Sequence, residues 1–373
     1  MTRTGATAVD ERVVHMILPG DVDDPAAPSG GNTYDRRVCR DLPAAGWRVD
    51  PRAASGSWPR PDDAARAGLA RELAQLPDDS VVLLDGLVAC GVPEVIGPEA
   101  DRLRLAVLIH LPLADETGLD PAVAAELDAR ERRTLHAVRA VVATSEWAAR
   151  RLVDHHELPA ARVRVARPGA DPAPVAAGTD GATGLLCVAS VTPRKGQHLL
   201  VEALAEIAEL PWRCTFVGGL AGAPDYVGQL RRRVDELGLG DRITFTGPRA
   251  GAELDAAYAA ADLLLLASYA ETYGMVVTEA LGRGIPVLAT DVDGLPEAVG
   301  RAADGTVPGI LVPPGQPSAL AGALRDWLGQ PRLRGRLKEA ARERRAMLEG
   351  WEMTSHSLAG TLERLRHEPR SAR

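Results

Sequence analysis

Residues 262–290 read DLLLLASYAETYGMVVTEALGRGIPVLAT. Two short apolar runs, DLLLLAS and IPVLAT, flank a stretch of mixed residues that is interrupted by glycines. Short apolar runs bounded by Gly and Pro are typical of strands buried on both faces, and the stretch between them is long enough for a helix. This segment therefore predicts a strand, a helix and a second strand parallel to the first.

The same alternation recurs along the chain and predicts the fold class. Further expected strands are RVVHMIL (12–18), SVVLLDG (80–86), LRLAVLIH (103–110), AVVATS (140–145), GLLCVAS (184–190), CTFVG (214–218), RITFTG (242–247) and GILVPP (309–314). The length of 373 residues fits two parallel sheets better than one. We expect an α/β protein with two facing, Rossmann-like, doubly wound domains, and a ligand in the interdomain cleft, beyond the carboxyl ends of the strands.

One stretch without apolar periodicity separates the two halves. It reads RPGADPAPVAAGTDGATG (167–184), is rich in Ala, Gly and Pro, and predicts the interdomain linker. We expect an N-terminal domain over residues 1–170 and a C-terminal domain over residues 171–350. Residues 351–373 are expected to form a C-terminal helix that packs across the domain junction.

Composition and charge limit the classes of partner. The net charge is −8 and no run of Lys or Arg is interleaved with aromatic residues, which argues against a nucleic-acid binder. The first residues, MTRTGATAVDERVV, lack the apolar core of a secretory signal, and no apolar run is long enough to cross a bilayer. We therefore expect a cytoplasmic protein with at most peripheral membrane contact.

Cysteines and histidines give no metal-binding spacing. The four cysteines are widely scattered with no C-x-x-C pair, so we expect buried, reduced thiols instead of disulfides or a zinc site. His155 and His156, in DHHELP (154–159), are expected at the surface.

Two loops that follow predicted strands have the residue types of a phosphate site. In PSGGNTY (28–34), Gly30, Gly31 and Asn32 precede a helix, where glycines allow close approach and helix-start amides favour an anion. The alternative is a tight loop with an Asn or Thr cap. In VASVTPRKGQHLLVEAL (188–204), Arg194 and Lys195 stand at the turn and suit a pair of phosphates; the alternative is a solvated loop pair.

The opening segment adds two carboxylates. If a helix begins near Gly274, Glu271 lies before it and Glu279 more than a turn inside it, so the two contact different parts of a ligand. The amides of Tyr273, Gly274, Met275 and Val276 then point towards the group that Glu271 approaches. The alternatives are that Glu271 serves the helix dipole and that Glu279 is an exposed helical residue. Glu279 stands on an apolar segment, where a position without a partner is costly, and this favours a ligand or a structural partner. His110 follows the strand LRLAVLI, and we expect it to contact a ligand and not only to end a buried strand.

From about Leu185 to Leu320 the sequence resembles the retaining glycosyltransferases of family 4, which have the two-domain GT-B architecture. The resemblance lies in the E-x7-E spacing of Glu271 and Glu279, and in AAADLLLLAS, ALGRGIPVLATDVDGLPEAV and DGTVPGILVPPG. The first half is similar more loosely, through SGGN, His110, VVATSEWAARRL and VARPGADP.

The resemblance implies transfer of a sugar from a nucleotide diphosphate sugar to an acceptor with retained anomeric configuration. It implies that the C-terminal domain binds the donor and the N-terminal domain the acceptor. Glu279 would bind the ribose hydroxyls, Glu271 the donor sugar together with the amides of residues 273–276, and Lys195 the diphosphate. His110 would lie by the donor sugar and the acceptor, so His110, Lys195 and Glu271 are the expected catalytic residues.

One position departs from the family pattern. The family often has an Arg five residues before the Lys, whereas this chain has Ser190 there, and Arg194 is the residue expected to replace that Arg.

We expect a front-face substitution assisted by the leaving phosphate, without a metal or other cofactor. The D-x-D triplets at Asp21/Asp23 and Asp291/Asp293 are accordingly interpreted as acidic loop residues. A nucleotide-sugar epimerase of the same fold and a non-catalytic sugar-nucleotide sensor are the alternative functions, and a small molecule, a glycan and a lipid are the alternative acceptors.

Overall fold

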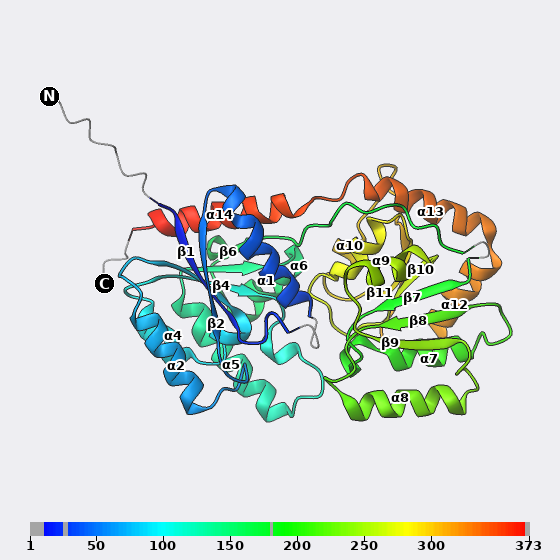
Figure 1. The fold of residues 1–373 in the computed structure, drawn as a ribbon, viewed down its shortest axis with the longest axis horizontal. Helices are drawn as coiled ribbons and strands as arrows, with labels where there is room; N and C mark the ends of the chain where they lie inside the picture. Colours follow the sequence, from blue (N-terminus) through cyan, green and yellow to red (C-terminus); the bar gives the residue numbers. More distant parts are fainter. Residues whose placement is uncertain (1–10, 25–28, 180–181, 370–373) are drawn as a thin grey trace.

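The computed structural model describes residues 11–24, 29–179 and 182–369. Two α/β domains lie side by side along the long axis of the molecule (Figure 1). Each contains a six-stranded sheet in which the paired strands are parallel. The predicted fold class, two doubly wound α/β domains, is confirmed.

The first sheet has the strand order β2-β1-β3-β4-β5-β6. Its strands are β1 (Val13–Pro19), β2 (Arg48–Ala54), β3 (Val81–Asp85), β4 (Arg104–Ile109), β5 (Ala140–Ala143) and β6 (Val163–Val165). The helices of this domain are α1 (Gly30–Asp41), α2 (Asp63–Ala74), α3 (Gly86–Ala89), α4 (Pro93–Glu99), α5 (Pro121–Ala137) and α6 (Glu146–His156), with the 3-10 turns η1 (Leu42–Ala45), η2 (Leu113–Asp115) and η3 (Ala160–Arg162). Strands β2 and β6, which the sequence did not predict, are the two edges of the sheet.

The second sheet has the strand order β12-β11-β10-β7-β8-β9. Its strands are β7 (Gly184–Val188), β8 (Arg213–Val217), β9 (Ile243–Gly247), β10 (Leu263–Leu266), β11 (Val287–Thr290) and β12 (Gly309–Val312). The helical elements are η4 (Pro193–Lys195), α7 (Gln197–Ala205), α8 (Pro224–Glu236), α9 (Gly251–Ala259), α10 (Met275–Leu281), α11 (Leu295–Val299), α12 (Pro317–Gly329) and α13 (Pro331–Arg345). All six of these strands overlap predicted apolar runs.

The order of the strands reverses once in each sheet, and this reversal positions the site. In the first sheet the chain passes from one side of β1 to the other, so the loops after β1 and β3 diverge. In the second sheet the loops after β7 and β10 diverge in the same way. In open parallel sheets the crevice for a ligand forms outside the carboxyl ends of the strands at such a reversal.

The last helix, α14 (Trp351–His367), returns to the first domain. Leu358 and Leu362 are fully buried in the core that also contains Val14 of β1 and Leu83 of β3. Helix α13 packs instead on the second domain, where Leu337 and Ala341 join its two cores. The chain therefore crosses the junction a second time between α13 and α14, as Figure 1 shows at the top of the molecule.

The predicted linker is held against the second domain over much of its length. The amide of Ala176 donates to Arg283 O and that of Gly178 to Ala259 O, while the amide of Ala170 donates to Glu349 O. Residues 180 and 181 of this stretch lie outside the described residues. The linker is thus an ordered strap alongside the second crossing of the chain.

Candidate functional site

His110 immediately follows β4 and lies between two carboxylates. Its Nε2 is 2.9 Å from Asp35 Oδ1, on α1, and 3.4 Å from Asp85 Oδ2, at the end of β3. Burial opposes protonation of His110, but the Asp35 and Asp85 carboxylates outweigh it, so the pKa of the imidazole is raised above its usual value. His110 is therefore held ready to carry a proton at this edge of the first sheet.

Asp85 is buried beside the same imidazole. Its Oδ1 accepts from the amide of Leu87 at 2.5 Å and so begins the short helix α3. Burial and the nearby Asp35 carboxylate raise the pKa of Asp85 to about 8. Neither acid was expected from the sequence; the only signal was the aspartate that ends the apolar run SVVLLD.

Gly30 and Gly31 form the first turn of α1 instead of a loop before it. Ser29 is the cap, since its Oγ accepts from the amide of Asn32 at 2.9 Å, so the alternative of an Asn or Thr cap is wrong. The Asn32 side chain donates to Asp21 O at 3.3 Å. A Cβ added to Gly31 would lie 3.1 Å from His110 Cδ2, so this glycine lets α1 approach the imidazole. Pro28, the first residue of the predicted loop, lies outside the described residues.

Lys195 and Glu271 form an ion pair where the second sheet reverses. Lys195 ends η4, which follows β7, and Glu271 lies in the loop that follows β10. Their side chains are only 16% and 12% exposed, respectively. The amide of Glu271 donates to Asp293 Oδ2 at 2.9 Å, so Asp293 is a loop acid that fixes the backbone of the Glu271 loop.

Arg194 points across the domain junction. Its Nε lies 3.2 Å from Glu116 Oε1 of the first domain, and its guanidinium donates to Ala270 O at 3.2 Å. Ser190 follows β7, and its carbonyl accepts from the Gln197 side chain at 3.0 Å. Arg194 thus lies at the same sheet edge as Ser190, but in this conformation its guanidinium contacts an acid of the facing domain.

Helix α10 begins at Met275, with Gly274 as its cap. Gly274 has a φ of 92°, and a Cβ there would lie 2.6 Å from Leu295 Cδ2, so glycine is required on both grounds. Glu271 precedes the helix and Glu279 lies inside it, as predicted. Tyr273 is buried, whereas Met275 and Val276 are half-buried. Met275 packs against the cores of both domains.

Glu279 has a structural partner that the sequence did not reveal. The hydroxyl of Tyr258, on α9, donates to Glu279 Oε2 at 2.7 Å, and the Arg283 guanidinium lies 4.5 Å from the centre of the Tyr258 ring. Burial raises the pKa of the Glu279 carboxyl above its usual value, and the bond from Tyr258 offsets part of this. The alternative of an exposed Glu279 is therefore wrong, since the side chain is half-buried and bonded to Tyr258, and its contact with a ligand stays a prediction.

The loop between Glu271 and α10 joins the two domains. Thr272 Oγ1 donates to His110 O at 2.5 Å, and Ser145 Oγ donates to Thr272 O at 2.6 Å. The Glu297 carboxylate accepts from the amides of Glu146 and Trp147 at 3.1 and 3.2 Å, so an acid of the second domain caps α6 of the first. The predicted residues of both halves are thus brought to one junction.

A pair of aromatic rings flanks the Lys195 turn. His198, in the first turn of α7, is 5.9 Å from Tyr269 between ring centres at an interplanar angle of 21°. Its Nδ1 is 2.9 Å from the Tyr226 hydroxyl, and its Nε2 is 3.2 Å from that of Tyr269. Burial lowers the pKa of His198. Of these rings, only those of His198 and Tyr269 are nearly parallel, and none of the three residues was selected from the sequence.

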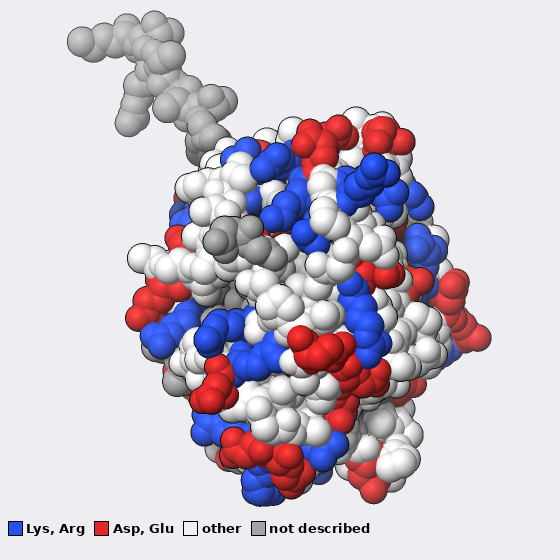
Figure 2. All heavy atoms as spheres, turned by 90° about the vertical axis from the view of Figure 1, so that its right-hand side faces the viewer, with Lys and Arg blue, Asp and Glu red and all other residues white. Residues whose placement is uncertain are grey.

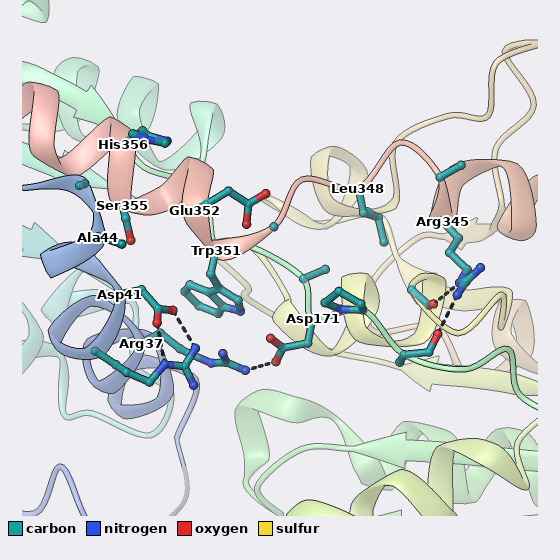
Figure 3. A pocket seen from close by; sticks show the side chains of 18 residues that line it. Arg37, Asp41, Ala44, Asp171, Arg345, Leu348, Trp351, Glu352, Ser355 and His356 are labelled. Carbon is teal, nitrogen blue, oxygen red and sulfur yellow. Dashed lines mark hydrogen bonds and ion pairs between the residues drawn. The ribbon is translucent and has the colours of Figure 1, made fainter.

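A cavity of about 640 Å³ lies beside the two crossings of the chain between the domains (Figure 3). It is lined by α1, η1, the linker, the residue after α10, the crossing before α14 and the first turns of α14. In Figure 3, Arg37 points to Asp171 of the linker, with which it pairs, and its guanidinium lies 5.4 Å from the centre of the Trp351 ring. Neither Lys195 nor Glu271 lines this cavity, so it is not the predicted ligand cleft.

The surface charge is mixed on the face shown in Figure 2, where basic and acidic side chains alternate with uncharged residues. Such a face does not offer the continuous positive stripe that a polyanion requires. Across the part of the chain that the structure describes, no helix combines the length and apolar character needed to cross a bilayer.

The second half of the chain matches a known family. Residues 179–344 match the model described as glycosyl transferases group 1. D-inositol 3-phosphate glycosyltransferase from Kineococcus radiotolerans is 35% identical over 253 residues, covering 61% of this chain and 57% of that protein. The protein of the same name from Streptomyces avermitilis is 33% identical over 248 residues, covering 61% and 52%. The chain thus spans about half the length of the curated relatives that it matches.

Solved glycosyltransferase structures share the whole architecture. Sucrose-phosphate synthase from Thermosynechococcus elongatus superposes with a TM-score of 0.73 at 23% identity, covering 95% of this chain and 98% of that one. Anabaena HepE in complex with UDP-glucose gives a TM-score of 0.73 at 18% identity, covering 94% and 99%. At these identities the likeness concerns the fold, and it confirms the expected GT-B architecture.

Proposed function

We propose that the chain, whose residues 179–344 match the model described as glycosyl transferases group 1, transfers a sugar from a nucleotide diphosphate sugar to an acceptor hydroxyl, with retention. One observation carries the proposal. The Lys195–Glu271 pair and His110 stand at facing sheet edges, and the loop that holds Glu271 is bonded to His110 through Thr272. A cation, a carboxylate and an imidazole thus meet at the junction of two domains.

The donor is assigned to the edge of the second sheet. Lys195 receives the diphosphate, and Arg194 is the second cation in reach when it leaves Glu116. Glu271 binds hydroxyls of the donor sugar, together with the amides of residues 273–276, and Glu279 binds the ribose. The α1 start at Gly30 and Gly31, with Asn32 beside it, completes the diphosphate site from the facing domain. Ser190 lines the same edge.

The chemistry follows from where charge develops. The bond between the anomeric carbon and the phosphate oxygen breaks while the acceptor oxygen bonds to the same face of that carbon. The acceptor proton passes to the leaving phosphate oxygen, so a nucleoside diphosphate and a glycoside are the products. Lys195 stabilises the negative charge on the departing diphosphate, and His110 orients the reacting sugar and acceptor. These groups supply the required charge without a metal.

The test begins with the donor. A thermal-shift screen against UDP-, GDP-, ADP- and dTDP-sugars identifies it, since a bound donor stabilises the folded state by mass action. The stabilising donor is then incubated with candidate acceptors, among them D-inositol 3-phosphate, which is suggested by the names of the relatives. We expect nucleoside diphosphate release that depends on the acceptor, and a product whose anomeric proton coupling matches that of the donor.

Four results would contradict the proposal. Epimerised donor without free nucleotide would indicate an epimerase. Donor binding that Lys195→Ala abolishes, with no product from any acceptor, would indicate a sensor. A product of inverted configuration, or turnover lost in EDTA and restored by Mn²⁺ or Mg²⁺, would contradict the retaining, metal-independent mechanism.

A further inference from the structure

A group of side chains that can bind a metal ion lies in the first domain, outside the proposed donor site. Asp128 belongs to α5, and His155 and His156 form the last turn of α6. One ligand atom of each lies within 4.8 Å of the ligand atoms of the other two. Two imidazoles and a carboxylate at this spacing are a set of zinc-type ligands.

His156 is not at the surface, contrary to the expectation from the sequence. It is 1% exposed, and its Nε2 is 2.8 Å from Oε1 of Glu131, which is equally buried. The other oxygen of Glu131 accepts from the amide of Leu113 at 2.9 Å. The Glu131 carboxylate thus has two donors and fixes the plane of the His156 ring.

The second ring nitrogen of His156, Nδ1, is the atom that indicates a ligand. Among the described residues, Nδ1 of His156 is buried and has no hydrogen-bond partner. An imidazole that donates through Nε2 keeps a lone pair on Nδ1, and burying that lone pair without a partner costs free energy. Metal-binding histidines are oriented in this way, by a carboxylate that accepts from the nitrogen opposite the metal.

The other two side chains complete the set and leave it accessible. His155 Nε2 is 2.5 Å from Asp128 Oδ1, and the His155 and His156 ring centres are 4.7 Å apart. His155 is 39% exposed, so an ion can reach the group from solvent. The neighbouring cation, Arg132, donates to His155 O and pairs with Glu157, so its charge is already offset.

From these observations we propose that Asp128, His155 and His156 form a binding site for a divalent transition-metal ion of the Zn²⁺ type. His156 binds through Nδ1, and Glu131 is its positioning residue. A water completes the tetrahedral coordination that Zn²⁺ prefers. The bound ion joins α5 to the end of α6, behind the loop that Glu131 holds through Leu113. It has no part in the transfer reaction.

The test measures metal binding directly, without turnover. The full chain is stripped of metal with EDTA and titrated with ZnCl₂ in a calorimeter. We expect one saturable site, and about tenfold or greater weakening in His155→Ala and in Asp128→Asn, both of which change accessible ligands. Glu131→Gln should weaken binding by about 10–100-fold, the usual effect of losing an outer carboxylate. His367→Ala, which removes an exposed histidine of α14, is the matched control and should bind as the parent does.

Cobalt gives an independent readout. Co²⁺ bound to two imidazoles and a carboxylate in a tetrahedral site should give visible absorption that Zn²⁺ abolishes, and His155→Ala should lack it. The proposal is overturned if the parent shows no saturable Zn²⁺ binding. It is equally overturned if His155→Ala and Asp128→Asn bind Zn²⁺ with the affinity of the parent.

Discussion

The carboxyl ends of the two sheets hold their charged groups in different ways. At the first sheet, one imidazole, His110, stands among the carboxylates of Asp35 and Asp85. At the second sheet each carboxylate has its own donor, Lys195 for Glu271 and Tyr258 for Glu279. The pKa values of His110 and Asp85, at the carboxyl end of the first sheet, are therefore raised, so these groups hold protons more tightly than usual. The carboxyl end of the second sheet presents one cation, Lys195, and two carboxylates that each have a bonded partner. Under the proposed function, the ammonium of Lys195 at the second sheet receives the diphosphate of the donor.

Removing the cation from the second edge should have the largest effect. Lys195→Met keeps the stem but removes the ammonium that stabilises the departing diphosphate, and it leaves Glu271 without its ion pair. We expect kcat to fall by about 10²–10³-fold, the usual effect of losing one transition-state donor. Steady-state kinetics with the identified donor measure this. Arg233→Ala, which removes an exposed cation of the same domain, is the control. Equal rates in the two variants would remove Lys195 from the mechanism.

The raised pKa values at the carboxyl end of the first sheet predict that the stability of the fold depends on pH. The pKa of Asp85 is raised to about 8, so the folded state holds a proton that the unfolded state releases near pH 4. The stability that this proton contributes to the folded state is fully present below the unfolded pKa and is lost as the pH rises towards 8. Over this range the free energy of unfolding falls by at most about 1.4 kcal/mol per pH unit. The raised pKa of His110 acts in the same direction.

Asp85→Asn tests this sign. The variant keeps an oxygen for the amide of Leu87 but carries no titrating group, so its free energy of unfolding should change less between pH 6 and 8 than that of the parent. The expected difference is up to about 2–3 kcal/mol, measured by urea unfolding across this range. Asp304→Asn is the control, because bonds from Thr306 lower the pKa of Asp304 and its titration lies below this range. If the free energies of unfolding of Asp85→Asn and of the parent change equally with pH, Asp85 does not hold the proton that its raised pKa implies.

The anchoring of Glu279 predicts a smaller loss. Tyr258→Phe removes the donor to the half-buried Glu279 carboxylate, and we expect the free energy of unfolding at pH 7 to fall by about 1–3 kcal/mol. Tyr226→Phe is the matched control, since among the described residues its hydroxyl bonds to the imidazole and the amide of His198 and to no carboxylate. Urea unfolding of both variants measures the difference. If both variants lose the same free energy of unfolding, the hydrogen bond from Tyr258 to the Glu279 carboxylate stabilises the fold no more than a bond to an uncharged group.

The two domains also differ in how far the sequence predicts them. Every strand of the second sheet overlaps a predicted apolar run, because these runs are short and continuously apolar. The missed strands of the first sheet are its edges: β2 is the polar RVDPRAA with a proline inside it, and β6 has three residues. An edge strand buries less of its surface, so its sequence needs no continuous apolar run.

The site shows the same division between local and distant information. The separation of Glu271 and Glu279 by a helix start is local, and glycine at position 274 predicts it correctly. The partners of those side chains are not local, since Tyr258 reaches Glu279 from another helix and Asp35 reaches His110 from α1. Such contacts depend on how helices pack on the sheets, which spacing along one chain does not encode.

The weakest expected effect concerns the contact that joins the two edges. Glu297 of the second domain caps α6 of the first and also pairs with Arg167, at 2.6 Å between Nε and Oε1. Glu297→Gln keeps an acceptor for one amide but removes the charge at the helix start, which should lower the free energy of unfolding by about 0.3–1 kcal/mol. Glu253→Gln, which changes an exposed acid of α9 that pairs within its own domain, is the control. Because the Glu297 contact spans the junction, small-angle scattering should also show a larger radius of gyration for Glu297→Gln than for Glu253→Gln. If both variants have the stability and radius of the parent, the Glu297 contact adds nothing to the junction, which is then held by its other contacts, such as those of Thr272 with His110 and of Arg194 with Glu116.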